Sequence, residues 1–69
     1  MRVSARNVLR GTITRIELGA VNAQVTIEIA RGVTIVSVIT VESVKKLGLA
    51  EGGPAYAVIE ASSVMVGGD

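Results

Sequence analysis

The chain has 69 residues, a formal net charge of +1 and a hydrophobic fraction of 49%, with Tyr56 as its one aromatic residue. This length allows a single small domain over residues 1–69, and the near-neutral charge argues against a nucleic-acid-binding protein that relies on a basic surface. Because histidine and cysteine are both absent, disulfides and the usual zinc ligands are excluded. No apolar run approaches the roughly 18 residues of a membrane-spanning helix, and no signal-peptide pattern is present. We therefore expect a cytoplasmic protein with neither membrane nor nucleic-acid partners.

The first predicted strand covers residues 8–18. Its apolar side chains alternate with polar ones, but the phase of the alternation changes midway along the run. A change of phase of this kind indicates a long, bent strand with a bulge near Thr14 and Arg15. Gly11 fits the same interpretation, because glycine inside a strand often marks a bend, and such a bend closes a sheet into a barrel.

Two further strands follow a turn at residues 19–20. Residues 21–29 alternate more regularly than any other segment, which predicts a half-buried antiparallel strand. A hairpin turn at residues 31–32 leads into a third strand at residues 33–39, which is apolar on both faces. So many apolar side chains are difficult to bury within one copy of a chain this short, so we expect a homo-oligomer in which a neighbouring subunit covers the second face.

One short helix is predicted at residues 40–47. Thr40 is a suitable N-cap, Glu42 favours the positive end of the helix, and the two lysines at 45–46 favour the negative end. Gly48 ends the helix. Two helical turns are not stable alone, so we expect this helix to close one end of the sheet.

The rest of the chain predicts two more strands. A loop at residues 51–54 leads to a fourth strand at residues 55–61, and residues 64–66 predict a short fifth strand before a loose tail. We therefore predict an all-β domain, a small five-stranded OB-like barrel with one short helix after the third strand.

The polar residues favour binding over catalysis. Without histidine the usual general base is missing, and the acidic residues are scattered along the chain, so we do not expect an enzyme. A single tyrosine is a poor platform for the base stacking by which OB-like barrels bind single-stranded nucleic acid. The remaining donors cluster at residues 4–7, before the first strand, and at residues 61–63, after the fourth. A barrel brings its first and last strands side by side, so these N–H and O–H groups suit a small oxyanion held between subunits.

The chain also carries a family resemblance over nearly its whole length. The residues that carry it lie in order and at matching spacing, and they are Ser4-Ala5-Arg6-Asn7, Gly11-Thr12-Ile13, Gly19-Ala20-Val21-Asn22-Ala23, Ile39-Thr40-x-Glu42-Ser43-Val44 and Ala57-Val58-Ile59-x-Ala61-Ser62-x-Val64. Together they resemble the molbindins, the Mop-type molybdate-binding proteins whose fold recurs in the transport-associated OB (TOBE) domains. The resemblance implies OB-like barrels that pair by sharing strands, three pairs forming a hexamer. It also implies molybdate or tungstate bound at subunit interfaces, with no organic cofactor.

Two kinds of anion site follow from the resemblance. In the first kind the ligands belong to two segments of one subunit, together with Thr40 of the partner subunit; the segments supply Ser4, Ala5 and Arg6, and Glu60, Ala61 and Ser62. The second kind, near the threefold axis, would use the turn formed by Gly19, Ala20, Val21 and Asn22. That turn is equally well interpreted as an ordinary hairpin corner.

Glu60 departs from the family pattern, because the family commonly has lysine at this position. Strand alternation places Glu60 on the same face as Ser62, beside the expected anion. The carboxylate therefore either turns to solvent, pairs with Arg6, or weakens the site. Three roles stay open: storage of molybdate, which a free-standing chain beginning at Met1 favours; an anion-sensing accessory domain of a transporter or regulator; and a structural oligomer that has lost its ligand.

Overall fold

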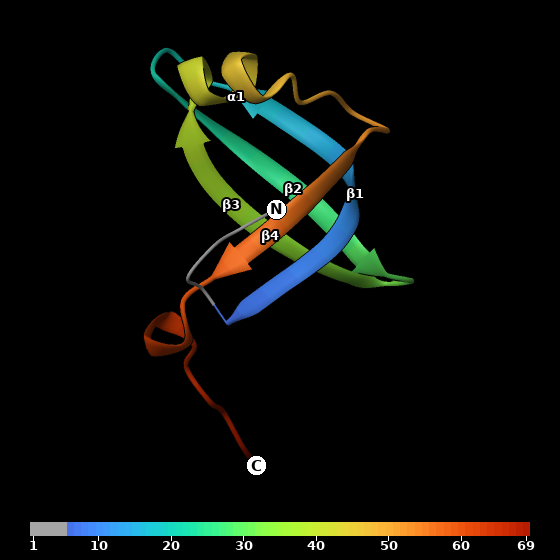
Figure 1. Ribbon diagram of the computed structural model, residues 1–69, viewed down its shortest axis with the longest axis vertical. Coiled ribbons are helices and arrows are strands. Elements are labelled where there is room, and N and C mark those ends of the chain that lie inside the picture. Colours follow the sequence, from blue (N-terminus) through green and yellow to red (C-terminus); the bar gives the residue numbers. More distant parts are fainter. Residues whose placement is uncertain (1–5) are drawn as a thin grey trace.

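The fold is a curled antiparallel sheet with a short helix at one end (Figure 1). The computed structural model describes residues 6–69. Four strands form the sheet in the order β3-β2-β1-β4, and the elements in chain order are β1 (Asn7–Leu18), β2 (Asn22–Ala30), β3 (Val33–Thr40), α1 (Val41–Leu47), β4 (Pro54–Ile59) and the 3₁₀ turn η1 (Ala61–Ser63). The predicted positions of the first three strands and of the helix are confirmed to within two residues at each end.

The bend in β1 is confirmed, and its physical cause is visible. The register with β2 shifts between Ile13 and Arg15, so that Thr14 is the extra residue of a bulge. At Gly11 a Cβ atom would lie 2.5 Å from the backbone oxygen of Glu28. Only glycine allows the two strands to approach so closely, and this approach lets the sheet curl.

The loop before β4, at residues 51–53, forms hydrogen bonds with the backbone of β1 on both sides of the bulge. The backbone N–H of Ile13 donates to the Gly53 carbonyl at 2.9 Å, and the Gly52 N–H donates back to the Ile13 carbonyl at 2.7 Å. The Glu51 carboxylate accepts a hydrogen bond from the Ile16 N–H at 2.8 Å. The buried Ile13 and half-buried Ile16 on either side of the bulge therefore have hydrogen-bond partners in this loop, as buried backbone requires.

Helix α1 closes one end of the curled sheet, as predicted. Thr40 caps it and accepts a hydrogen bond from the Ser43 N–H, and Gly48 ends it with a left-handed φ of 64°. Val44 joins a small core of six buried apolar side chains: Ile13, Ala23, Val25, Ile27, Val44 and Ala57. Within residues 6–69, no helix has both the length and the apolar character needed to cross a membrane.

The predicted fifth strand is wrong, and so is the predicted end of the fourth. Strand β4 ends at Ile59, and the following residues form η1, in which the Ser63 N–H donates to the Glu60 carbonyl at 2.9 Å. This turn directs the chain away from the sheet (Figure 1). A strand needs a neighbour with which to exchange backbone hydrogen bonds, and residues 64–66 have none among residues 6–69. The described chain is therefore a four-stranded curled sheet whose edges are β3 and β4.

Apolar side chains remain on the surface of this single chain. On the outer face of β3, Val36 and Val38 are 56% and 65% exposed, and in the C-terminal segment Met65 and Val66 are 95% and 94% exposed. The β-branched residues that predict strands so clearly are thus too numerous for one core. The second face of β3 is not covered by any residue of the described chain.

Candidate functional site

The structure brings Arg6, the described residue of the first predicted segment, to the end of β4, where the second segment begins. Strands β1 and β4 are antiparallel neighbours, and the outermost pair of their ladder is Asn7 with Ile59. The Asn7 side-chain amide donates a hydrogen bond to the Ile59 carbonyl at 3.2 Å, in a half-buried position. The start of the first strand is therefore fixed beside the end of the fourth, as predicted. Ser4 and Ala5, which belong to the same predicted site, lie outside the described residues.

Arg6 and Glu60 occupy the next positions beyond that pair, one on each chain segment. Both side chains are exposed. The ion pairs within residues 6–69 join Arg15 to Glu17 and Glu42 to Lys46, and neither of them involves Arg6 or Glu60. The second of the three alternatives for Glu60, a salt bridge to Arg6, is therefore not formed among residues 6–69.

Ala61 and Ser62 lie in η1 and are exposed. The expectation that strand alternation places Glu60 and Ser62 on one face is wrong, because the alternation stops at Ile59. In a 3₁₀ turn successive side chains are rotated by about a third of a turn, so the positions of Glu60 and Ser62 follow helical geometry. Ser62 nonetheless lies only two residues after Glu60, near the end of the sheet where β1 begins.

Thr40 lies elsewhere in the chain, at the start of α1. Its hydroxyl oxygen accepts a hydrogen bond from the Ser43 N–H at 3.0 Å, and its O–H donates to the Ser43 hydroxyl at 2.8 Å. Figure 1 shows α1 and η1 at opposite ends of the sheet. A single chain therefore does not bring Thr40 together with Arg6, Ala61 and Ser62.

Ser43 is a polar group that the sequence reasoning did not identify as a candidate ligand. Its half-buried side chain stands beside the Thr40 hydroxyl, so the two residues present an adjacent pair of hydroxyl groups. The sequence does contain a signal for Ser43, because this residue follows the predicted N-cap, Thr40, by three positions. At this spacing a side chain in the first helical turn lies next to the capping side chain.

The second predicted site, the turn from Gly19 to Asn22, is exposed, and much of its backbone is already paired. The Gly19 N–H donates to the Asn22 carbonyl at 2.8 Å, and the Val21 carbonyl accepts from the Val41 N–H at 2.8 Å. A shallow hollow of about 320 Å³ adjoins the turn and is lined in part by Glu17. Ala20 is exposed at the corner of the turn. The hydrogen bonds within the turn are those of a hairpin corner, the structural alternative given above.

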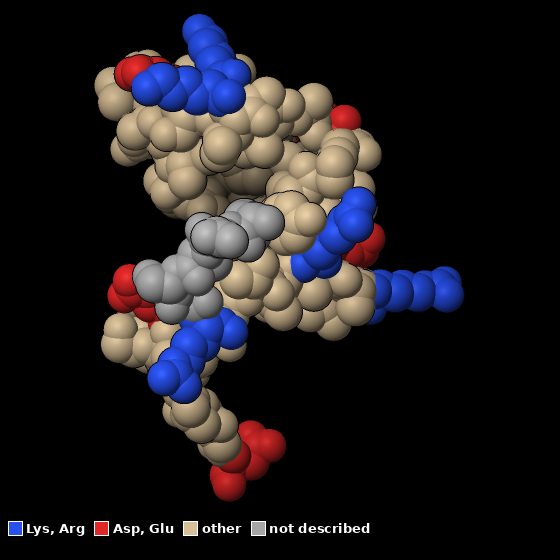
Figure 2. Space-filling view, in the orientation of Figure 1, with Lys and Arg blue, Asp and Glu red and all other residues tan. Residues whose placement is uncertain are grey.

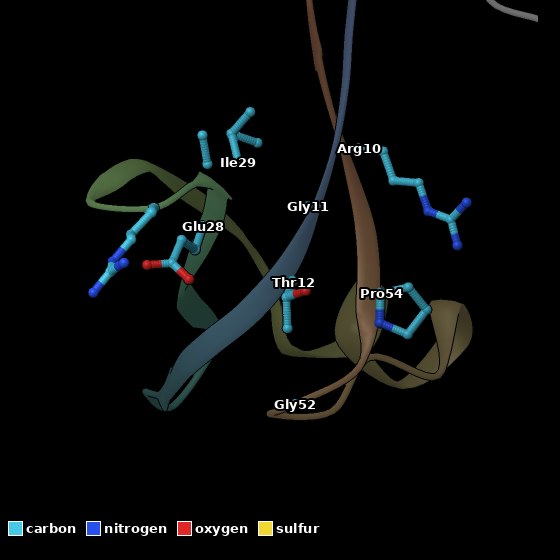
Figure 3. Close-up of a pocket in the computed structure, with 9 residues that line it drawn as sticks. Arg10, Gly11, Thr12, Glu28, Ile29, Gly52 and Pro54 are labelled. Atoms are coloured by element: carbon cyan, nitrogen blue, oxygen red, sulfur yellow. The ribbon is translucent and has the colours of Figure 1, made fainter.

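A larger hollow of about 530 Å³ lies near Gly11, and no sequence pattern predicts it. Its polar lining includes Arg10, Glu28 and Arg31. Figure 3 shows the Arg10 side chain on one side of β1 and the Glu28 carboxylate on the other. These two groups do not converge on one point, so they do not make a ligand site together. In Figure 2 the lysine and arginine side chains on the visible face are likewise scattered, with no single basic patch.

Comparison with known proteins finds relatives that are described as molybdenum-binding or molybdate-binding proteins. A protein of Haemophilus influenzae described as a probable molybdenum-pterin-binding protein is 49% identical over 67 residues, which cover 97% of both chains. The structure of apo MopII from Clostridium pasteurianum superimposes with a TM-score of 0.90 at 40% identity, covering 97% of this chain and all of that one. The cytoplasmic molybdate-binding protein ModG, with molybdate bound, gives a TM-score of 0.89 at 52% identity. That match covers 94% of this chain but 46% of ModG.

The family assignment rests on a match over most of the sequence. The model of the TOBE domain matches residues 3–66, a range that contains every strand and the helix described above. The chain belongs to the TOBE domain family.

Proposed function

We propose that this protein binds molybdate or tungstate and stores it in the cytoplasm as a homo-oligomer. The observation that carries the proposal is the end-to-end similarity to a relative described as molybdenum-pterin-binding, at 49% identity over 97% of both chains. ModG, described as a cytoplasmic molybdate-binding protein, is similar in fold and 52% identical. The proposed role is binding, with no catalytic step.

The ligand proposed is the free oxyanion. A pterin is a flat heterocycle that proteins hold by stacking and edge hydrogen bonds, and this chain has one aromatic side chain, Tyr56, which is half-exposed. A tetrahedral oxyanion only accepts hydrogen bonds, so it needs donors such as guanidinium, hydroxyl and backbone N–H groups. Arg6 and Ser62 supply such donors at the adjoining ends of β1 and β4.

The first proposed site is completed by a second copy of the chain. One subunit supplies Ser4, Ala5, Arg6, Ala61 and Ser62, with Glu60 beside them, and Thr40 of the partner subunit supplies a hydroxyl. We add Ser43 of the partner subunit, because its hydroxyl lies 2.8 Å from that of Thr40. The separation of the two halves in one chain supports this division between subunits. The turn from Gly19 to Asn22 is proposed as the second site, mainly through backbone and amide donors.

The surface of the single chain supports assembly. An apolar groove of about 430 Å³ is lined by residues from both edges of the sheet and from the helix, among them Ile39, Leu47 and Val58. Exposed apolar segments of this kind are costly in water and are usually covered by a partner. We propose that residues 64–66 extend the sheet of a second copy, and that three such pairs form a hexamer.

One observation favours a second role. The match covers 46% of ModG, so a unit of this kind also occurs within a longer protein. An anion-sensing accessory domain would use the same site, but its occupied state would change the affinity for a transporter or regulator. Storage requires only high occupancy and release.

Equilibrium dialysis tests the proposal. The purified oligomer is dialysed against molybdate or tungstate, and bound metal is counted per subunit, with sulfate as competitor. We expect metal bound in proportion to the number of interface sites and little displacement by the smaller sulfate ion. Metal content equal to that of a dialysed control protein would overturn the proposed function and favour a structural oligomer.

A further inference from the structure

Two opposite charges lie just beyond the ladder that joins β1 to β4, beside the proposed anion site. The last pair is Asn7 with Ile59, and one residue further along each segment are Arg6 and Glu60. Both residues lie just outside the strands, since β1 begins at Asn7 and β4 ends at Ile59, and each is bonded directly to one member of that pair, so their long side chains start from neighbouring points of the backbone. The hydrogen bond from the Asn7 amide to the Ile59 carbonyl, at 3.2 Å, holds the two segments together at this point.

Among residues 6–69, Glu60 and Arg6 form no ion pair, but both side chains are exposed and can turn toward each other. The backbone of Glu60 is fixed, because its carbonyl accepts from the Ser63 N–H at 2.9 Å, while its side chain is exposed. The first charged residue within β1 is Arg10, which is paired in register with the uncharged Tyr56. Among residues 6–69, Glu60 is therefore the carboxylate that adjoins Arg6 at this end of the two strands.

We infer that Glu60 is a specificity-determining residue of the proposed site, acting as an internal anion that competes for Arg6 and disfavours dianions more than monoanions. This inference rests on the proposed function, because it concerns the same site. A bound oxyanion must take the guanidinium from the carboxylate and must also lie near it. The first effect is the same for every anion. The second grows in proportion to the charge of the ligand, because the Coulomb energy is the product of the two charges.

The charge dependence gives the inference a quantitative signature. Glu60→Gln removes the negative charge and keeps nearly the same shape, so it removes the repulsion that either anion meets. Where repulsion dominates, a gain of about tenfold for a dianion corresponds to about threefold for a monoanion of the same shape, since the energy is halved. A purely structural effect of the substitution would change both affinities by the same factor.

The experiment is titration calorimetry with two tetrahedral probes, molybdate as dianion and perrhenate as monoanion, at slightly alkaline pH. The proteins are the unmodified chain, Glu60→Gln, Glu60→Lys and a matched control, Asp69→Asn, which removes a carboxylate from the exposed C-terminal end. Sedimentation and thermal unfolding verify that all four have the same assembly and stability. We expect Glu60→Gln to tighten molybdate by about tenfold and perrhenate by clearly less, Glu60→Lys to tighten molybdate further, and Asp69→Asn to change neither.

The possible outcomes separate this inference from the proposed function. Molybdate binding by the unmodified chain that Glu60→Gln leaves unchanged overturns the inference and keeps the proposed function. Equal gains for molybdate and perrhenate also overturn it, because they leave only an effect that is the same for every anion and no repulsion that grows with the charge of the ligand. Absence of molybdate binding in all four proteins overturns both.

Discussion

The side-chain amide of Asn7 donates a hydrogen bond to the backbone carbonyl of Ile59, at 3.2 Å, across 52 residues of sequence. This bond joins the beginning of the first strand to the end of the last one. It lies one residue from Arg6 on one side and one residue from Glu60 on the other. The geometry of the proposed anion site therefore depends on a polar contact outside the list of predicted ligands.

Replacing Asn7 by Ala should loosen this corner of the sheet. The half-buried Ile59 carbonyl would lose its side-chain donor, at a cost of about 0.5–1.5 kcal/mol in the free energy of unfolding. Arg6 would also lose its fixed position, so molybdate affinity should fall as well. Urea unfolding and calorimetry measure the two effects, with Gln24→Ala as a control on the exposed face of β2. A loss of stability without any loss of affinity would show that Asn7 does not position the site.

Gly11→Ala should lower the stability of the fold much more than a glycine-to-alanine change at an open position does. The new Cβ would meet the Glu28 backbone oxygen at 2.5 Å and the Ile27 Cγ2 atom at 2.7 Å. Because backbone atoms cannot move aside singly, β1 and β2 must separate, and overpacking of this kind costs about 1–3 kcal/mol or more. Gly67→Ala is a matched control, since nothing lies within 4 Å of its added Cβ. Equal melting temperatures for the two variants would contradict the close approach of the strands.

Much of this fold could be predicted because its signals are local. The change of phase in the first strand located the bulge near Thr14 and Arg15, and the capping residues Thr40 and Gly48 located the helix. Each of these signals depends on neighbouring residues in one chain, where side-chain spacing decides the structure. The adjacency of the first and last strands followed from the barrel topology, and it brought Arg6 beside the end of β4.

The errors concern features that depend on partners. Residues 64–66 have the composition of a strand, but a strand exists only where another strand offers hydrogen bonds, and η1 removes this segment from its own sheet. The predicted alternation through Ser62 failed for the same reason, because it assumed an extended chain. Ser43 was missed because its spacing of three residues from the N-cap threonine indicates only that the two side chains are neighbours, whereas the hydrogen bond between their hydroxyls is seen only in the structure.

Arg6→Ala should weaken anion binding while leaving assembly unchanged. The Arg6 side chain is exposed and makes no ion pair within the described residues, so its loss removes little packing. A hydrogen bond to a charged group is worth about 1.5–3 kcal/mol, which corresponds to a loss of roughly ten- to a hundredfold in affinity. Arg31→Ala, in the turn between β2 and β3, is the control for net charge. If both variants bind molybdate equally well, Arg6 is not a ligand.

The hydroxyls of Thr40 and Ser43, at the start of α1, should contribute differently to stability and to anion binding. Thr40→Ala removes the N-cap and should cost about 1 kcal/mol of stability, whereas Thr40→Ser retains the capping oxygen. Ser43→Ala keeps the backbone N–H that donates to Thr40, so the cap persists and stability should change little. Both alanine variants should weaken molybdate binding if both hydroxyls face the anion. Thermal unfolding and calorimetry on the three variants distinguish these effects, and unchanged affinity in Ser43→Ala would remove Ser43 from the proposed site.

Assembly should depend on the C-terminal segment. Met65 and Val66 are 95% and 94% exposed in the single chain, which is an unfavourable arrangement for apolar side chains unless another copy covers them. Replacing Val66 by Glu places a charge in the proposed contact between subunits, and burial of an unpaired charge is strongly unfavourable. Sedimentation at micromolar concentration should therefore show an oligomer for the unmodified chain and smaller species for Val66→Glu. Asp69→Asn, three residues further along, serves as the control that should leave assembly intact.

Because the proposed first site needs Thr40 of the partner subunit, Val66→Glu should lose molybdate binding together with assembly. A folded 7.1 kDa monomer of the unmodified chain that still binds molybdate would contradict the shared site.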